Sequence, residues 1–238
     1  LGKKSVAIGN NTLNAQNFTT ATDTYNTVVG YNAGNDITTG TSNTLIGGLA
    51  GDALTDADFN IAIGVNSLTS DTLGSRSVAI GMGTLQTQNF TTATNSHNTA
   101  VGYHAGQEVT TGVQNTLIGA LAGDSITDAN NNTALGYAAL STNQRGAFNV
   151  AVGVGALQTA NPSGAADTYN TAVGFDAGNA VTTGARNTLI GALAGDDLTT
   201  GGDNVAVGYE ALKNEDAHSR NTAIGTQALF SLNAGADA

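Results

Sequence analysis

A five-residue pattern of apolar and polar positions recurs thirteen times along the chain. Its first place holds Asn or Ser, its second Val, Ile or Thr, its third Ala, Leu or Val, its fourth Ile, Val or Leu, and its fifth always Gly. β-Branched residues at the second and fourth places favour a strand over a helix. The pattern predicts thirteen short strands, which end at Gly9, Gly30, Gly47, Gly64, Gly81, Gly102, Gly119, Gly136, Gly153, Gly174, Gly191, Gly208 and Gly225.

The spacing of these glycines adds a second, longer period. One 21-residue step is followed by three 17-residue steps, and this 72-residue block occurs three times. Such short steps exclude a helical-hairpin repeat. We therefore predict one all-β domain over residues 1–238, a parallel β-solenoid of about 13 coils of 17 or 21 residues. Its blocks lie at about 9–80, 81–152 and 153–224, followed by a terminal coil.

Alternation of side chains along each strand separates the five places into two faces. The second and fourth places share the bulky face, which we expect to fill the core. The face with Asn, Ala and Gly is small, and we expect another chain to cover it. Each coil is predicted to hold two short strands and two turns. Stacked residues such as Asn26, Asn43 and Asn60 predict an amide ladder.

A large aliphatic residue follows each glycine, but its position shifts. Some coils carry Leu four residues after the glycine, as at Leu68. Others carry Gly there and place the bulk three residues later, as at Gly51 and Leu54. This compensation of volume indicates a narrow, tightly packed core.

Composition removes several functional classes. The chain has no cysteine, which excludes disulfides and thiolate metal sites. Its formal charge of −11, with 7 Lys and Arg, makes nucleic acid an unfavourable partner. No apolar run approaches the ~18 residues of a membrane span, so we expect no membrane insertion.

Candidate chemistry is sparse. His97, His104 and His218 do not recur at the 72-residue spacing. The recurrent aspartates after glycine, such as Asp52 and Asp124, are typical of turns, where the carboxylate binds nearby N–H groups. We therefore predict no catalytic residues, no metal site and no cofactor, and hence no enzymatic activity.

Aromatic residues of the 21-residue steps are the best candidates for ligand contact. Phe18 and Phe90 lie in the shared segment QNFTTAT, and Tyr25 and Tyr169 close the same loops. Long loops of solenoids often lie on the binding face, so we predict glycan contact at these four residues. A further set directly follows the glycines and is expected to pack at corners, or else to stack on sugars: Tyr31, Tyr103, Tyr137, Phe175 and Tyr209.

The motifs SVAIG at 5–9 and 77–81, with the NTAVG variants, resemble the head repeat of trimeric autotransporter adhesins, which also occurs in phage tail fibres. The steps between motifs in this chain are longer than those of adhesin heads. The resemblance implies a left-handed parallel β-roll and a homotrimer of chains lying side by side. It predicts a structural or adhesive fibre module, extracellular on a virion tail fibre or a cell surface, that acts as a rigid rod in attachment.

On this view the chain is a fragment of a longer fibre. Its partners would be its own copies and a host cell-surface glycan or protein. Three alternatives remain open: a subunit that polymerises end to end into an extracellular filament, a tailspike that depolymerises polysaccharide, and a glycan- or ice-binding module.

Overall fold

A computed structural model describes residues 2–231 and confirms the predicted fold class, an all-β parallel β-solenoid of about thirteen turns. The described residues form no helix. Accordingly, residues 2–231 contain no helix able to cross a membrane. The chain divides into two compact units, residues 1–115 and 116–238, which are described separately.

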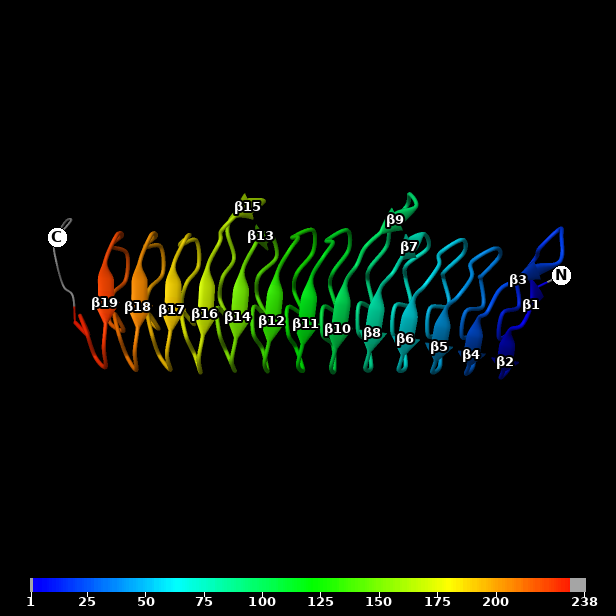
Figure 1. Ribbon diagram of the computed structural model, residues 1–238, viewed down its shortest axis with the longest axis horizontal. Coiled ribbons are helices and arrows are strands. Elements are labelled where there is room, and N and C mark those ends of the chain that lie inside the picture. The colour runs from blue at the N-terminus through cyan, green and yellow to red at the C-terminus, as the bar shows by residue number, and fades with distance from the viewer. Residues whose placement is uncertain (1, 232–238) are drawn as a thin grey trace. The chain divides into compact units, whose positions relative to one another are not determined.

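The first unit stacks six three-residue strands into one parallel sheet, in the order β10-β8-β6-β5-β4-β2 (Figure 1). Equivalent places of successive repeats lie side by side, as where Val28 pairs with Leu45. The strands are β2 (Val6–Ile8), β4 (Thr27–Val29), β5 (Thr44–Ile46), β6 (Ile61–Ile63), β8 (Val78–Ile80) and β10 (Thr99–Val101).

The second unit repeats this arrangement with seven strands, in the order β19-β18-β17-β16-β14-β12-β11. The register again joins equivalent places, as where Ala172 pairs with Leu189. The strands are β11 (Thr116–Ile118), β12 (Thr133–Leu135), β14 (Val150–Val152), β16 (Thr171–Val173), β17 (Thr188–Ile190), β18 (Val205–Val207) and β19 (Thr222–Ile224).

The prediction of two strands in every coil is wrong for most turns. Among residues 2–231, second strands occur only where a 21-residue step stacks on its neighbour, as two-residue pairs: β1 (Gly2–Lys3) with β3 (Thr22–Asp23), β7 (Gly74–Ser75) with β9 (Thr94–Asn95), and β13 (Gly146–Ala147) with β15 (Ala166–Asp167). Elsewhere the far side of each turn is a run of tight bends. Neighbouring turns are joined there by single backbone hydrogen bonds, such as Asp36 N to Asp52 O at 2.9 Å.

The assignment of the two strand faces is also wrong, because the structure places them the other way round. Third-place residues such as Val28, Leu45 and Ala62 are fully buried, and so are the first-place asparagines Asn26 and Asn43. The β-branched residues of the second and fourth places point outward, and none of them is buried within residues 2–231.

Two physical requirements explain this orientation. The interior of one turn is narrow, so Ala, or Leu opposite a glycine, fits where two rows of Ile and Val would overpack it. The inner bends also expose backbone N–H and C=O groups to the core, and buried groups of this kind need partners. The asparagine amides supply those partners only if they point inward.

The predicted compensation of volume is confirmed inside the turns. Leu68, Leu85, Ile37 and Leu54 are all fully buried. Where Gly51 follows the strand, the methyl groups of Leu45 and Leu54 fill the space that its side chain would take.

Candidate functional surfaces

An apolar stripe runs along each unit on the outer face of the strands. It consists of the fourth-place side chains, all Ile, Val or Leu, and the second-place side chains, which are Thr in eight repeats and Val or Ile in the other five. The more exposed members include Ile46, Ile61, Leu135, Val150, Val173 and Ile190. The stripe is uncharged, and the core of each turn is complete without it. Exposed apolar patches that follow one face of a protein commonly mark an interaction surface.

A second row of side chains, here called the corner row, precedes each first-place Asn or Ser. Each member adopts a left-handed backbone conformation, with φ between +49° and +65°. It comprises Lys4, Tyr25, Ser42, Phe59, Arg76, His97 and Gln114 in the first unit, and Asn131, Phe148, Tyr169, Arg186, Asp203 and Arg220 in the second.

Neighbours in the corner row contact one another from turn to turn. The Lys4 amine lies 5.1 Å from the centre of the Tyr25 ring. The Arg76 guanidinium lies 4.9 Å from the centre of the Phe59 ring. The rings of Phe148 and Tyr169 stack with centres 5.0 Å apart. The row therefore gathers cationic and aromatic groups on the surface of an acidic protein.

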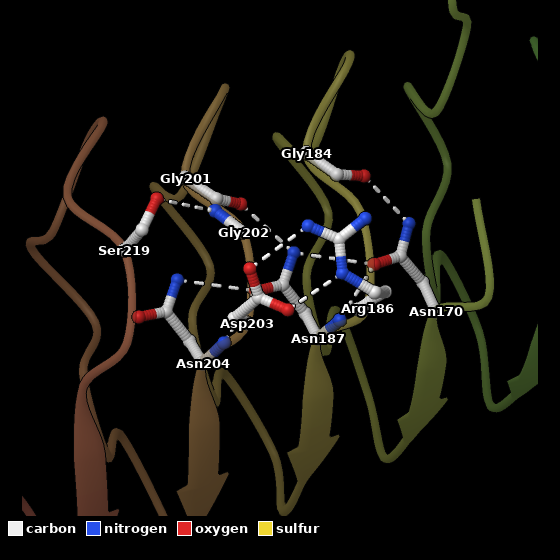
Figure 2. A network of polar contacts seen from close by, with 9 residues as sticks. All are labelled: Asn170, Gly184, Arg186, Asn187, Gly201, Gly202, Asp203, Asn204 and Ser219. Carbon is white, nitrogen blue, oxygen red and sulfur yellow. Dashed lines mark hydrogen bonds and ion pairs between the residues drawn. The ribbon is translucent and has the colours of Figure 1, made fainter.

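An ion pair continues the corner row in the second unit. Arg186 donates from Nε and from one terminal nitrogen to the two carboxylate oxygens of Asp203, at 2.6 and 2.8 Å (Figure 2). The guanidinium holds the pKa of the Asp203 carboxyl below its usual value. Both side chains are exposed, so the pair contributes little to stability.

Sequence reasoning missed the corner row as a surface, although it singled out Tyr25 and Tyr169. The available signal was the variable place directly before each repeated Asn or Ser. That place accepts charged, aromatic and small residues alike, as an outward-facing position does.

The four predicted glycan-contact residues divide by exposure. Tyr25 is 55% exposed and Tyr169 is 50% exposed, both in the corner row. Phe18 is half-buried. Phe90 is only 6% exposed, so its ring offers little surface to a ligand. The prediction of glycan contact remains untested for all four.

The aromatic residues after the glycines do not pack into the core. Tyr31 and Tyr103 in the first unit, and Tyr137, Phe175 and Tyr209 in the second, each expose about half of their surface. Tyr103 stacks on His104, with ring centres 3.9 Å apart.

The predicted asparagine ladder is present in both units, as Figure 2 shows for the second. The side-chain oxygen of Asn170 accepts from the backbone N–H of Asn187 in the next turn at 2.9 Å. The Asn187 oxygen accepts in the same way from the N–H of Asn204. Most of the amide nitrogens also donate across their own turn, as from Asn187 to the carbonyl of Gly201 at 2.9 Å. The ladder thus joins turns and closes each turn on itself.

A buried carboxylate adjoins the ladder in the turn that precedes one 21-residue step. Asp71 is fully buried, and its Oδ1 accepts from the N–H groups of Gly74 and Phe90. Its Oδ2 accepts from the Gln88 side chain at 2.6 Å. Burial raises the pKa of this carboxyl, and these hydrogen bonds offset the shift only in part. Gln88 also donates to Ser77, the one residue in this unit besides Ser5 that replaces a ladder asparagine.

The other titratable groups are dispersed. His97 is exposed and His104 is half-buried, while His218 lies 2.5 Å from the carboxylate of the buried Glu215. Asp52 and Asp196 are half-buried, which raises the pKa of both carboxyls.

Within residues 2–231, His, Asp and Glu form no group of three or more that could hold a metal ion. The same residues enclose no pocket, so a ligand would have to bind on open surface.

No known protein family matches this chain, and neither does any curated protein or any solved structure compared with it.

Proposed function

We propose that this chain is a structural and adhesive fibre module, a homotrimeric, left-handed β-roll that acts as a rigid extracellular rod in attachment to a host or a surface. It would belong to a virion tail fibre or to a cell-surface adhesin and would act without catalysis. Handedness and the number of copies rest on the likeness of SVAIG and NTAVG to adhesin head repeats.

One observation carries the proposal, namely the outward apolar stripe. Six or seven rungs at ~4.8 Å spacing make the stripe of each unit roughly 30 Å long. All of its residues except Leu135 are β-branched and rigid, so little side-chain entropy is lost when they are covered. A second and third copy of the same stripe would form a matching surface, since like rungs lie at like heights.

The test is the oligomeric state of the purified chain by sedimentation velocity. A trimer is expected for the natural sequence. Ile80→Lys or Ile190→Lys should give folded monomers, because each copy would place an unpaired charge in an apolar interface.

Ser163→Lys is the matched control, since it adds the same charge at an exposed residue of a 21-residue step. It should remain trimeric. A folded natural monomer would overturn the trimer, and indefinite filaments in electron micrographs would favour end-to-end polymerisation. Release of reducing sugar from polysaccharide by the natural chain would contradict a purely adhesive role.

A further inference from the structure

Two exposed rings of the corner row flank a small residue in the first unit. Tyr25, Ser42 and Phe59 occupy successive turns, and their backbones are joined where Ser42 N donates to Thr24 O at 2.7 Å and Phe59 N to Thr41 O at 3.1 Å. Turns repeat at the strand spacing, so the backbones that carry the two rings stand ~9.6 Å apart along the stack. Only the short Ser42 side chain lies between them in the row.

Each ring has a cationic neighbour in the row on the side away from Ser42. Lys4 lies over Tyr25 from the preceding turn, and Arg76 lies over Phe59 from the following turn. Along the row, Ser42 lies on the other side of each ring. Tyr25 is 55% exposed and Phe59 is 51% exposed, so both rings are accessible to a ligand.

The separation between Tyr25 and Phe59 leaves room for one six-membered ring between the two aromatic rings. Stacked rings have centres ~4.5 Å or slightly more apart, and two such contacts span the ~9.6 Å between Tyr25 and Phe59. A six-membered ring can therefore contact both aromatic faces at once.

The groups around the gap favour a sugar over an aromatic side chain. Lys4 donates to Asp23 at 2.8 Å and to the Tyr25 hydroxyl at 3.1 Å, which leaves donors and acceptors at one edge. Arg76 donates to Asn95 at the other edge. A pyranose has apolar C–H faces for the rings and a rim of hydroxyls for these polar groups, whereas an aromatic ring has no such rim.

We infer that Tyr25 and Phe59 bind one uncharged pyranose ring of a glycan, sandwiched above Ser42. The protein's charge of −11 and the pairing of Lys4 with Asp23 disfavour an acidic saccharide. This inference rests on the proposed attachment function and assigns it a ligand class and a site.

The chain contains its own matched variants of this site. Two blocks later the equivalent places hold Tyr169, Arg186 and Asp203, and there the middle place is occupied by a guanidinium bound to its neighbour. One block after Phe59, the equivalent place holds Asn131. Ser42 and Arg186 both have φ of 59°, and Phe59 and Asn131 have 60° and 58°. Ser42→Arg and Phe59→Asn should therefore fold normally.

The experiment is binding of a panel of uncharged oligosaccharides, with gluco, galacto, manno and N-acetylhexosamine units, measured by saturation-transfer NMR and calorimetry. The natural chain should bind at least one of them. Ser42→Arg, which fills the gap, and Phe59→Asn, which removes one ring, should each weaken that binding about tenfold or more. Phe148→Arg removes an exposed ring elsewhere in the row, copies Arg76 and Arg220, and should leave affinity unchanged.

Absence of binding to every saccharide would overturn the inference, as would binding that both variants leave intact. Binding of an aromatic peptide without saccharide binding would also overturn it. A trimer that binds no sugar would contradict this site but leave the fibre proposal standing. A monomer that binds sugar would support this site but contradict the trimer.

Discussion

Individual residues at the bends of this solenoid adopt conformations that side chains usually avoid. Leu68 and Leu85 have φ of 51° and 48° and are fully buried. A left-handed conformation costs such residues about 1 kcal/mol or more. Burial of one leucine side chain stabilises by about 1.5–3 kcal/mol, which offsets that cost. The bend is therefore stable only because it points the leucine into the core.

Asp71 is a buried residue through which we expect pH to affect stability. Burial raises the pKa of its carboxyl in the folded state above the unfolded value of about 4. The folded chain then binds more protons than the unfolded chain as pH rises through this interval, so stability falls. The equivalent places 72 residues later hold Asn143, Asn149 and Ala160 in place of Asp71, Ser77 and Gln88.

We predict that grafting this set, as Asp71→Asn, Ser77→Asn and Gln88→Ala, removes the loss of stability between about pH 4 and neutral pH that Asp71 causes. Denaturant unfolding across this range measures the difference from the natural chain. The control keeps the carboxylate and carries only Ser77→Asn and Gln88→Ala, so it should retain the pH dependence. Equal pH profiles for all three proteins would contradict the prediction.

At the scale of the strand, the repeated glycine sets how closely turns can stack. Gly64 has φ of +135°, and a Cβ added there would lie 2.4 Å from the carbonyl oxygen of Gly81 in the next turn. The same close approach recurs from turn to turn, as where a Cβ on Gly47 would lie 2.5 Å from the carbonyl oxygen of Gly64. The invariant fifth place thus reflects both the backbone conformation and the lack of room for a side chain.

We predict that Gly64→Ala lowers the free energy of unfolding by about 2–3 kcal/mol, because it combines backbone strain with a steric clash. Gly48→Ala is the matched control: no atom lies within 4 Å of its added Cβ, and Ala120 and Ala192 stand at the equivalent places. That change should stay within about 0.5 kcal/mol. Denaturation midpoints at one protein concentration give both values, and equal losses for the two variants would count against this account.

At the scale of the whole molecule, stability comes from contacts between neighbouring turns. Such repeat proteins behave as sums of units and nearest-neighbour interfaces. The segments NTLIGGLAGD at 43–52 and NTLIGALAGD at 115–124 are nearly identical and occupy equivalent places in consecutive blocks. A whole block can therefore be removed with the repeat pattern preserved.

We predict that deletion of residues 48–119 yields a shorter protein that still folds as a β-solenoid, since Ala120 takes the place of Gly48. Deletion of residues 48–55 removes about half a turn, shifts all later rungs out of phase and should prevent cooperative folding. Far-ultraviolet circular dichroism and thermal melting compare the two. Failure of the first deletion, or normal folding of the second, would show that the blocks are not interchangeable.

Much of the fold follows from the order of residues alone. The regular steps between the repeated glycines predict the number of turns, and β-branched places predict the strands. Asn26, Asn43 and Asn60 predict the ladder, since equal spacing brings equal residues together in a stack. The shift of bulk between Leu68 and Leu54 likewise indicates a core of constant, narrow volume.

The candidate surfaces depended instead on the folded chain. Alternation along a strand separates Ala62 from Ile61 and Ile63 but does not say which side is inside. The size of the turn's interior and the hydrogen-bonding needs of its bends resolve this, and both arise only once the turn closes. The placement of Tyr25 and Phe59 in one row likewise depends on the closed turns. The two rings belong to different repeats of the chain, and only stacking of turns brings them onto one corner.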